Sequence, residues 1–439
     1  MNRQSEIKCS YFLVLLISLL FLLPCANSVT GAEIPTAWDV ASRKAELPTI
    51  EDLTAGKVKK GDVIDKSNVD LVKQWLTPGT IEAIMQGMIL TMGTNSNPYD
   101  GVPKEYVEAT EKNKGKAVMD ENRAVYYEKI GTPWPGGIPY PEPKNGDEVM
   151  AILKYGVGII DYVTDGVLRF VNRDGKVYKN VGMSTTQVWV SNRIFPPLGT
   201  YPGYEGQMFR RVSTLTFPVE IKGQGQFAIR YYDDSKQYDS GFAYFPAYKR
   251  TLRISTTTWQ DNIAGSDLTN GDSEGFREPY ADWKFKLIGT EYLLIPEHRA
   301  PFPYISNKGM DCDPRLKWDV GVRFPRIGWA VFPVFVVEAV PTVKHIYGKK
   351  ILYLGTPPYL LSSGAAEIME SYDRQGNLWK YYVNINGLFV EKWHSSIPFG
   401  VVMTDLQSQH TTQFLFNYTI NQNVDPARCS LKELLARGR

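Results

Sequence analysis

The stretch GVLRFVNRDGKVYKNVG, residues 166–182, decides the fold, because two runs of alternating apolar and polar residues flank a single turn. Asp174 and Gly175 lie between these runs, and an Asp-Gly pair favours the tight turn of a β-hairpin. The stretch therefore predicts two neighbouring antiparallel strands.

The same pattern recurs further along the chain. Residues 211–234 are predicted to turn at Gly223–Gly225, and residues 240–256 near Pro246 and Ala247. Successive hairpins without long helices between them favour a strongly curved antiparallel sheet within one large α+β domain. Further predicted strand runs are residues 283–296, 332–340, 349–355 and 367–386.

Residues 33–150 have a different residue pattern, which predicts an irregular, partly helical arm. Residues 68–88 have a helical apolar spacing interrupted at Pro78 and Gly79, which predicts a helix, a turn and a second helix. Residues 131–146 are so rich in proline and glycine that they predict an extended connector. A helix capped by Asp147 is expected to follow, and residues 151–439 are expected to form the sheet domain and to pack with the arm as one unit.

Residues 1–32 have the pattern of a signal peptide: a positively charged start, a short apolar run and small residues at two cleavage patterns. We expect cleavage after Ala32 and export of the chain. Cys25 leaves lipidation open as an alternative, although Pro24 stands where a small residue should precede a lipidated cysteine. Cys312 and Cys429 remain after cleavage, and they could form one disulfide.

The composition excludes several functions. Lys and Arg total 49 against 47 acidic residues, so a nucleic-acid partner is not expected. The four histidines form no metal-binding motif, and no nucleophile elbow or glycine-rich phosphate loop occurs. We therefore expect no cofactor, no metal and no enzymatic activity.

The acidic, glycine-rich loop from Asp261 to Glu274 leaves one chemical alternative open. Asp261, Asp267 and Asp272 could supply oxygen ligands to a hard cation in a metal-dependent enzyme. Their spacing is not that of a calcium-binding EF-hand loop, and Asp, Asn and Gly also build turns without an ion. A structural loop at the rim of the molecule is the simpler interpretation.

Aromatic residues on two predicted strands suggest the wall of a ligand cavity. Alternation places Phe227, Ile229 and Tyr231 on one face of their strand, and Phe242 and Tyr244 on one face of the next. These faces could line an ordinary core or a cavity that holds a lipid-like molecule. We take the five residues as candidate wall residues, with Trp189 and Trp283 as further candidates. Lys249, Arg250 and Arg253 follow and suggest either an anionic headgroup or solvated charge.

Five further stretches have a combined pattern that is informative: GGIPYPEPKNGDEVM (136–150), FAYFPAYKRTLR (242–253), GSDLTNGDSEGF (265–276), WKFKLIGTEYLLIP (283–296) and SYDRQGNLWK (371–380). Together they resemble a Gram-negative family catalogued as domain-of-unknown-function family thirteen twenty-nine, whose members are described as outer membrane lipoprotein-sorting-like. The family pattern matches Tyr244, Pro246, Arg250, Gly265, Ser266, Asp267, Asp272, Gly275, Phe276 and Trp283. Phe242 and Lys249 depart from it, since tryptophan and arginine are usual there.

The resemblance implies a fold similar to that of the periplasmic lipoprotein carrier LolA and the receptor LolB: a half-open antiparallel barrel around a hydrophobic cavity, covered by helices. It also implies a periplasmic protein, with association to the outer membrane left open, that works with an inner-membrane transporter or an outer-membrane protein. We expect a non-enzymatic carrier of a lipid or other hydrophobic molecule. The alternatives are a structural adaptor that docks such a partner and the metal-dependent enzyme.

Overall fold

The computed structural model describes residues 47–93, 103–254, 259–297, 317–356, 365–393 and 395–438. The predicted signal peptide and Cys312 lie outside these residues. No helix within the described part of the chain is long and apolar enough to cross a membrane.

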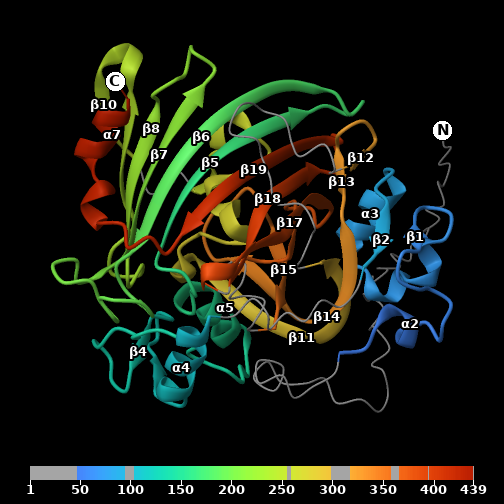
Figure 1. Ribbon diagram of the computed structural model, residues 1–439, viewed down its shortest axis with the longest axis horizontal. Helices are drawn as coiled ribbons and strands as arrows, with labels where there is room; N and C mark the ends of the chain where they lie inside the picture. The colour runs from blue at the N-terminus through green and yellow to red at the C-terminus, as the bar shows by residue number, and fades with distance from the viewer. Residues whose placement is uncertain are drawn as a thin grey trace, which may run out of the picture.

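One large, strongly curved and open sheet dominates the molecule (Figure 1). The hairpin predicted at residues 166–182 joins β5 (Asp161–Val171) to β6 (Val177–Trp189), and its turn is made by residues 172–176. Four strands follow β6 in sequence order and end at an open edge: β7 (Gln207–Phe217), β8 (Gly225–Tyr231), β9 (Ser240–Phe245) and β10 (Arg250–Ile254).

The other half of the sheet comes from the C-terminal part of the chain. β19 (His410–Ile420) pairs with β5 and joins the two halves. From β19 outward the order is β18 (Ser395–Asp405), β17 (Leu378–Val390), β16 (Ile368–Tyr372), β15 (Lys349–Gly355) and β14 (Gly328–Pro341), which also pairs with β11 (Trp283–Pro296). These pairs are antiparallel, so the predicted fold class, a strongly curved antiparallel sheet with helices, is confirmed.

Alternation along the strands gives the sheet two different faces. On the first, which we call the loop face, Leu168, Leu352 and Tyr382 belong to a core that includes α5 (Gly146–Tyr155). On the opposite face, which we call the arm face, Val167, Ile351 and Val383 pack in a core with residues of the N-terminal arm. Asn145, not Asp147, caps α5, because its side-chain oxygen accepts the Glu148 N–H at 2.9 Å.

The first part of the arm, residues 47–93, packs on the arm face. It contains α2 (Ile50–Leu53), β1 (Val63–Ile64), α3 (Pro78–Met85) and β2 (Leu90–Met92), and β2 pairs in parallel with β14. The predicted first helix of residues 68–88 is wrong: two short 3-10 turns, Val69–Leu71 and Lys73–Trp75, occur there instead. Val69, Val72, Trp75 and Leu76 are still buried, so the apolar spacing marked buried positions correctly but not the kind of helix.

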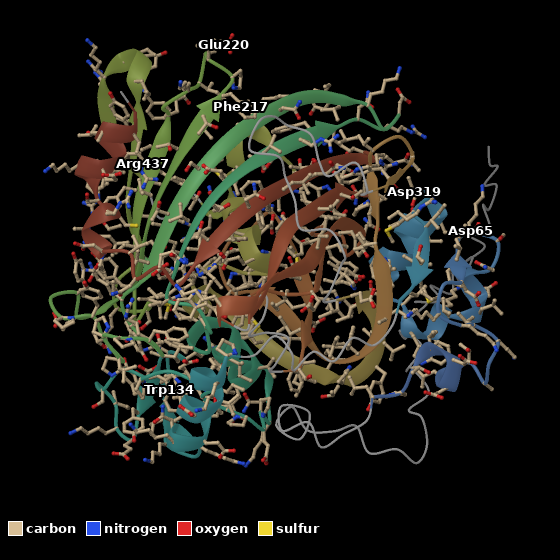
Figure 2. The ribbon with its side chains drawn as sticks, in the orientation of Figure 1. Asp65, Trp134, Phe217, Glu220, Asp319 and Arg437 are labelled. Carbon is tan, nitrogen blue, oxygen red and sulfur yellow. The ribbon has the colours of Figure 1, made fainter. Side chains whose placement is uncertain are left out.

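Residues 103–146 lie apart from that first segment. They form α4 (Lys104–Asn113), a hairpin of β3 (Ala117–Met119) and β4 (Val125–Tyr127), and the proline-rich connector. Figure 2 shows Trp134 of the connector beside α4, and its buried indole Nε1 donates to the Gly137 oxygen at 2.9 Å. The connector is thus held by core contacts as well as by its extended backbone. A second small hairpin pairs β12 (Lys317–Asp319) with β13 (Phe324–Arg326).

The C-terminal helix α7 (Leu431–Arg437) covers β7, β8 and β9 (Figure 2). Ser430 caps it, because its hydroxyl oxygen accepts the Glu433 N–H at 3.3 Å, and Arg437 donates to the Thr186 hydroxyl at 2.9 Å. Cys429, just before the helix, is a buried free cysteine whose thiol donates to the Thr186 carbonyl oxygen. Burial raises the pKa of this thiol to about 12, which makes it a poor nucleophile near neutral pH.

Candidate functional site

The acidic loop predicted at the rim lies instead against the loop face of the sheet. We call residues 259–282 the plug segment; it is the yellow ribbon behind β5, β6 and β19 in Figure 1. Its apolar residues Leu268, Phe276 and Tyr280 are buried in the same core as Leu168, Leu352 and Tyr382 of the sheet. The segment therefore fills part of the space that the curved sheet encloses.

Asp267 ties one part of the plug segment to β19. Its Oδ2 lies 2.6 Å from Nδ1 of His410 and accepts the Thr412 hydroxyl at 2.7 Å, while its backbone N–H donates to Thr412 Oγ1. Lys380 of β17 donates to the Asp267 carbonyl oxygen. The hydrogen bond to Asp267 raises the pKa of His410 above its usual range, because the carboxylate favours the charged imidazole.

Asp272 attaches the next part of the plug segment to β15 through a fully buried ion pair. Lys350 Nζ lies 3.0 Å from Asp272 and 2.8 Å from Glu278, and both partners of each pair are buried. Tyr347 donates its hydroxyl to Asp272 at 2.8 Å, and Glu278 also contacts His345 Nε2 at 2.8 Å. Burial acts to raise the pKa of Asp272, but Lys350, Lys380 and the Thr269 N–H together outweigh it, so this pKa is lowered and the carboxylate stays charged.

Two motif glycines allow the turns of the plug segment. Gly265 and Gly275 have φ angles of +81° and +84°, a backbone conformation that other residues rarely adopt. A Cβ at Gly275 would come within 2.5 Å of the Ala366 Cβ, so glycine is also needed for close packing there. Ser266 is buried and bonds to Leu268 within the turn, and Phe276 stacks edge-on against Trp283 at 5.1 Å. These motif residues shape and seat the plug segment.

A cavity of about 120 Å³ remains between the plug segment and the sheet. Ile263 and Leu268 close it from the plug side, and strands on both sides of the β5–β19 junction form its wall. The aromatic and aliphatic part of its lining is Val157, Ile159, Tyr162, Met183, Trp189, Tyr382, Val401, Phe414, Phe416, Tyr418 and Ile420.

Aromatic rings in this wall contact one another edge to face. Phe414 and Phe416 lie 4.9 Å apart, Phe416 and Tyr418 4.8 Å, and Tyr418 and Tyr162 5.3 Å. The series continues from Tyr162 to Trp189 at 5.8 Å. Such contacts fix the ring positions, so the wall is a preformed apolar surface.

Buried polar atoms in the same lining have no hydrogen-bond partner among the described residues. They are Thr164 Oγ1, Trp189 Nε1, the Tyr382 hydroxyl and both amide atoms of Asn384. Native proteins leave few such atoms unsatisfied, because each costs free energy when it is removed from water. Polar groups of a bound molecule, or water, would satisfy them.

Trp189 is the one candidate wall residue from the sequence that lines this cavity. Phe227, Ile229, Phe242 and Tyr244 lie on the opposite face of the sheet, in a core with Leu434 of α7. Tyr231 follows Ile229 with the same alternation and is half-buried. Trp283 is fully buried in the core of the loop face, between Phe276 and His345. Alternation correctly placed Phe227 and Ile229 on the same face of the sheet as Phe242 and Tyr244. It contains no information on which face of the sheet lines a cavity.

The remaining candidates lie away from the cavity. Pro246 begins a 3-10 turn after β9, and Arg250 is exposed at the start of β10. The three aspartates of the loop lie in different surroundings: Asp261 is exposed, Asp267 contacts His410 and Asp272 pairs with Lys350. Within the part of the chain that the structure describes, no three His, Cys, Asp or Glu residues form a group that could hold a metal ion.

A second, larger groove lies between the arm and the arm face, with a volume of about 1250 Å³. Trp75, Ile81, Ile288 and Leu293 contribute apolar surface, while Lys57, Asp70, Lys73, Glu82 and Glu291 contribute charge. Nothing in the sequence singled out this groove.

No curated protein sequence matches the chain. A domain described as an outer membrane lipoprotein-sorting protein from Vibrio parahaemolyticus is similar at 17% identity and a TM-score of 0.43, over 63% of this chain and 91% of that one. A DUF1329 family protein from Desulfovibrio piger is similar at 13% identity and a TM-score of 0.43, over 63% and 92%. A LolA superfamily protein from Nitrosomonas europaea is similar at 11% identity and a TM-score of 0.39, over 66% and 100%. The family model described as Protein of unknown function (DUF1329) matches residues 63–431, and the chain belongs to that family.

Proposed function

We propose that this protein is a non-enzymatic carrier that binds a lipid-like or other hydrophobic molecule on the loop face of its sheet. The observation that supports this most is the aromatic cavity between the plug segment and strands β5, β6 and β17–β19. Apolar cavities with a few polar groups are the usual form of small-molecule sites. Within the proposal, the N-terminal signal exports the protein to the periplasm, where it exchanges its cargo with a membrane transporter or an outer-membrane protein.

The present cavity is too small for a lipid, so binding requires the plug segment to move. A volume of about 120 Å³ corresponds to about four water molecules at ~30 Å³ each, and it is smaller than a cavity of ~150 Å³ that holds benzene. Displacing Leu268 would remove a buried aliphatic side chain from the core, at a cost of about 1.5–3 kcal/mol, and displacing the partly buried Ile263 would cost less. Ten methylene groups of a ligand would contribute about 8 kcal/mol in return.

The two attachments of the plug segment suggest which part moves. The Asp267–His410 contact is partly accessible, with 14% and 24% of the two side chains exposed. The Asp272–Lys350 pair has no exposure, and separating it would leave charges buried without a partner. We infer that residues 261–268 open while the end near Asp272 stays fixed.

Titration with a fluorescent acyl probe tests this proposal. Val401→Phe would extend a lining side chain into the cavity and is expected to weaken probe binding at least about tenfold, the effect of losing about 1.4 kcal/mol. Ile288→Phe enlarges a more exposed lining side chain in the groove beneath the arm and is expected to leave binding unchanged. Loss of binding in the Ile288 variant alone would indicate that the probe binds in that groove. Absence of binding by the wild-type protein would contradict the carrier proposal.

A structural adaptor is the second candidate, and one observation favours it: the protein's own plug segment already occupies much of the loop face. An adaptor would dock its partner through an outer surface, for example the open edge at β10, where Tyr248 and Leu252 are exposed. Such a protein needs no opening of residues 261–268. Probe uptake that increases when Asp267→Ala frees this segment would support the carrier, while stable folding without any uptake would support the adaptor.

A further inference from the structure

Three arginine side chains gather around the ring of Phe209 at one end of the aromatic wall. The guanidinium carbons of Arg211, Arg230 and Arg277 lie 5.8, 5.6 and 5.1 Å from the ring centroid. Phe209 also contacts Trp189 of the cavity wall, with ring centroids 6.0 Å apart. The apolar cavity therefore has a cationic end.

The carboxylates near this cluster do not pair with every arginine. Arg230 pairs with Asp239 at 2.8 Å, and Arg277 pairs with Glu274 of the plug segment. Arg211 lines the cavity, and within the described ranges no carboxylate forms an ion pair with it and its buried Nε has no hydrogen-bond partner. Burial and the charge of Arg211 lower the pKa of Arg277, and Arg230 adds to this effect. A further anion would thus be attracted to the cluster.

Glu274 already brings a carboxylate to this end of the cavity. It lines the cavity, and its φ of 55° places it in the left-handed region that residues other than glycine rarely adopt. The Ala366 N–H donates to the Glu274 backbone carbonyl oxygen and holds the backbone there. Rotation of the Glu274 side chain alone would therefore free Arg277. A carboxylate on a ligand could take the same place.

We propose that the cargo of this cavity is a hydrophobic carboxylic acid, whose apolar body lies along the aromatic wall and whose carboxylate binds Arg211 and Arg277 in place of Glu274. This inference rests on the proposed carrier function and names its ligand class. The Tyr382 hydroxyl and the Asn384 amide, which have no hydrogen-bond partner among the described residues, would donate to the same polar group or to water beside it. Arginine suits this role because its planar guanidinium binds a carboxylate through two parallel hydrogen bonds.

Binding of cis-parinaric acid, a fluorescent long-chain carboxylic acid, and of its uncharged methyl ester tests the inference. The wild-type protein is expected to bind the acid about tenfold or more tightly than the ester, the usual scale of a hydrogen-bonded charge contact. Arg211→Gln should weaken binding of the acid about tenfold and leave the ester unaffected.

Arg210→Gln is the matched control. Arg210 is the preceding residue of β7, also half-buried, but its guanidinium lies over Tyr204 and Phe227 on the opposite face, at 5.2 and 5.1 Å. Its loss should change neither affinity. Glu274→Gln, which removes the competing charge and keeps the size of the side chain, should bind the acid about tenfold more tightly.

Each outcome decides one level of the proposal. Equal affinity of the wild-type protein for acid and ester, or equal weakening of both by Arg211→Gln, would overturn the carboxylic acid and keep the carrier. Unchanged or weaker acid binding by Glu274→Gln would contradict the displacement of that carboxylate. Failure of the wild-type protein to bind either probe would overturn the carrier function itself.

Discussion

At the scale of single residues, Asp267 and His410 form a contact whose charge depends on pH. The ordinary pKa of histidine is 6.5, and the contact raises it in the folded protein. A raised folded-state pKa stabilises the protein fully below pH 6.5, and this stabilisation is lost as the pH rises through the higher folded-state value. Asp405 also favours the charged imidazole, Arg323 opposes it, and Tyr178 lies 2.5 Å from its Nε2.

We therefore predict that Asp267→Asn lowers the free energy of unfolding by about 1 kcal/mol at pH 6, the size of a partly exposed charged contact. The difference from the wild-type protein should shrink as the pH rises above the folded-state pKa of His410. Denaturant unfolding between pH 5.5 and 8.5 measures this. Asp261→Asn, at an exposed aspartate of the same loop, serves as the control, and an identical pH profile for the two variants would contradict the prediction.

The roles of these aspartates could be only partly predicted from the sequence. A cluster of Asp, Asn and Gly predicts a turn-rich loop, and Thr269 and Asp272 do cap a turn there. The partners His410, Lys350 and Tyr347 lie between 75 and 143 positions further along the chain. Contacts over such separations depend on the pairing of the whole sheet. Local sequence patterns do not report them, and for this reason the sequence analysis predicted a loop at the rim.

At the scale of elements, two phenylalanines of similar burial lie on opposite faces of the sheet, and substituting each one tests which face binds the ligand. Phe416 of β19 lines the cavity, while Phe227 of β8 packs beneath α7; their exposed fractions are 5% and 4%. We predict that Phe416→Leu weakens acyl-probe binding several-fold, because it removes part of the aromatic wall, whereas Phe227→Leu leaves it unchanged. Both should destabilise the fold by about 1 kcal/mol.

Probe titration together with thermal unfolding of both variants checks this prediction. Equal stability loss in the two variants makes each the control for the other. Loss of binding in Phe227→Leu but not in Phe416→Leu would return the site to the face suggested by the sequence.

Local sequence patterns predicted the strands, but they did not predict which elements cover each face of the sheet. The turn at Asp174–Gly175 and the alternation beside it involve neighbouring residues, so the β5–β6 hairpin could be predicted. Phe414, Phe416 and Tyr418 alternate in the same way as Phe227, Ile229 and Tyr231, yet only the former line the cavity. The choice of face depends on whether α7 or the plug segment covers it, and alternation does not report this. The same limit applies to residues 69–75, where the apolar spacing predicted a helix and tertiary packing produced 3-10 turns.

At the scale of the whole molecule, the plug segment fills part of the space that the curved, open sheet encloses. The sheet supplies a curved surface that one layer of strands cannot fill, and the chain covers it with α5 and residues 259–282. Fold class was predictable because it follows from a succession of hairpins. The cavity was not, because its wall joins strands from β5 to β19 and a loop between them in sequence.

Native mass spectrometry tests the central claim most directly. The full-length chain would be expressed in a Gram-negative host and, since the proposal places the protein in the periplasm, would be released from there without detergent. The carrier account predicts a species heavier than the mature polypeptide, whose added mass is lost on organic extraction and is recovered as a hydrophobic molecule. Only the mass of the bare polypeptide, with no hydrophobic molecule in the extract, would contradict it.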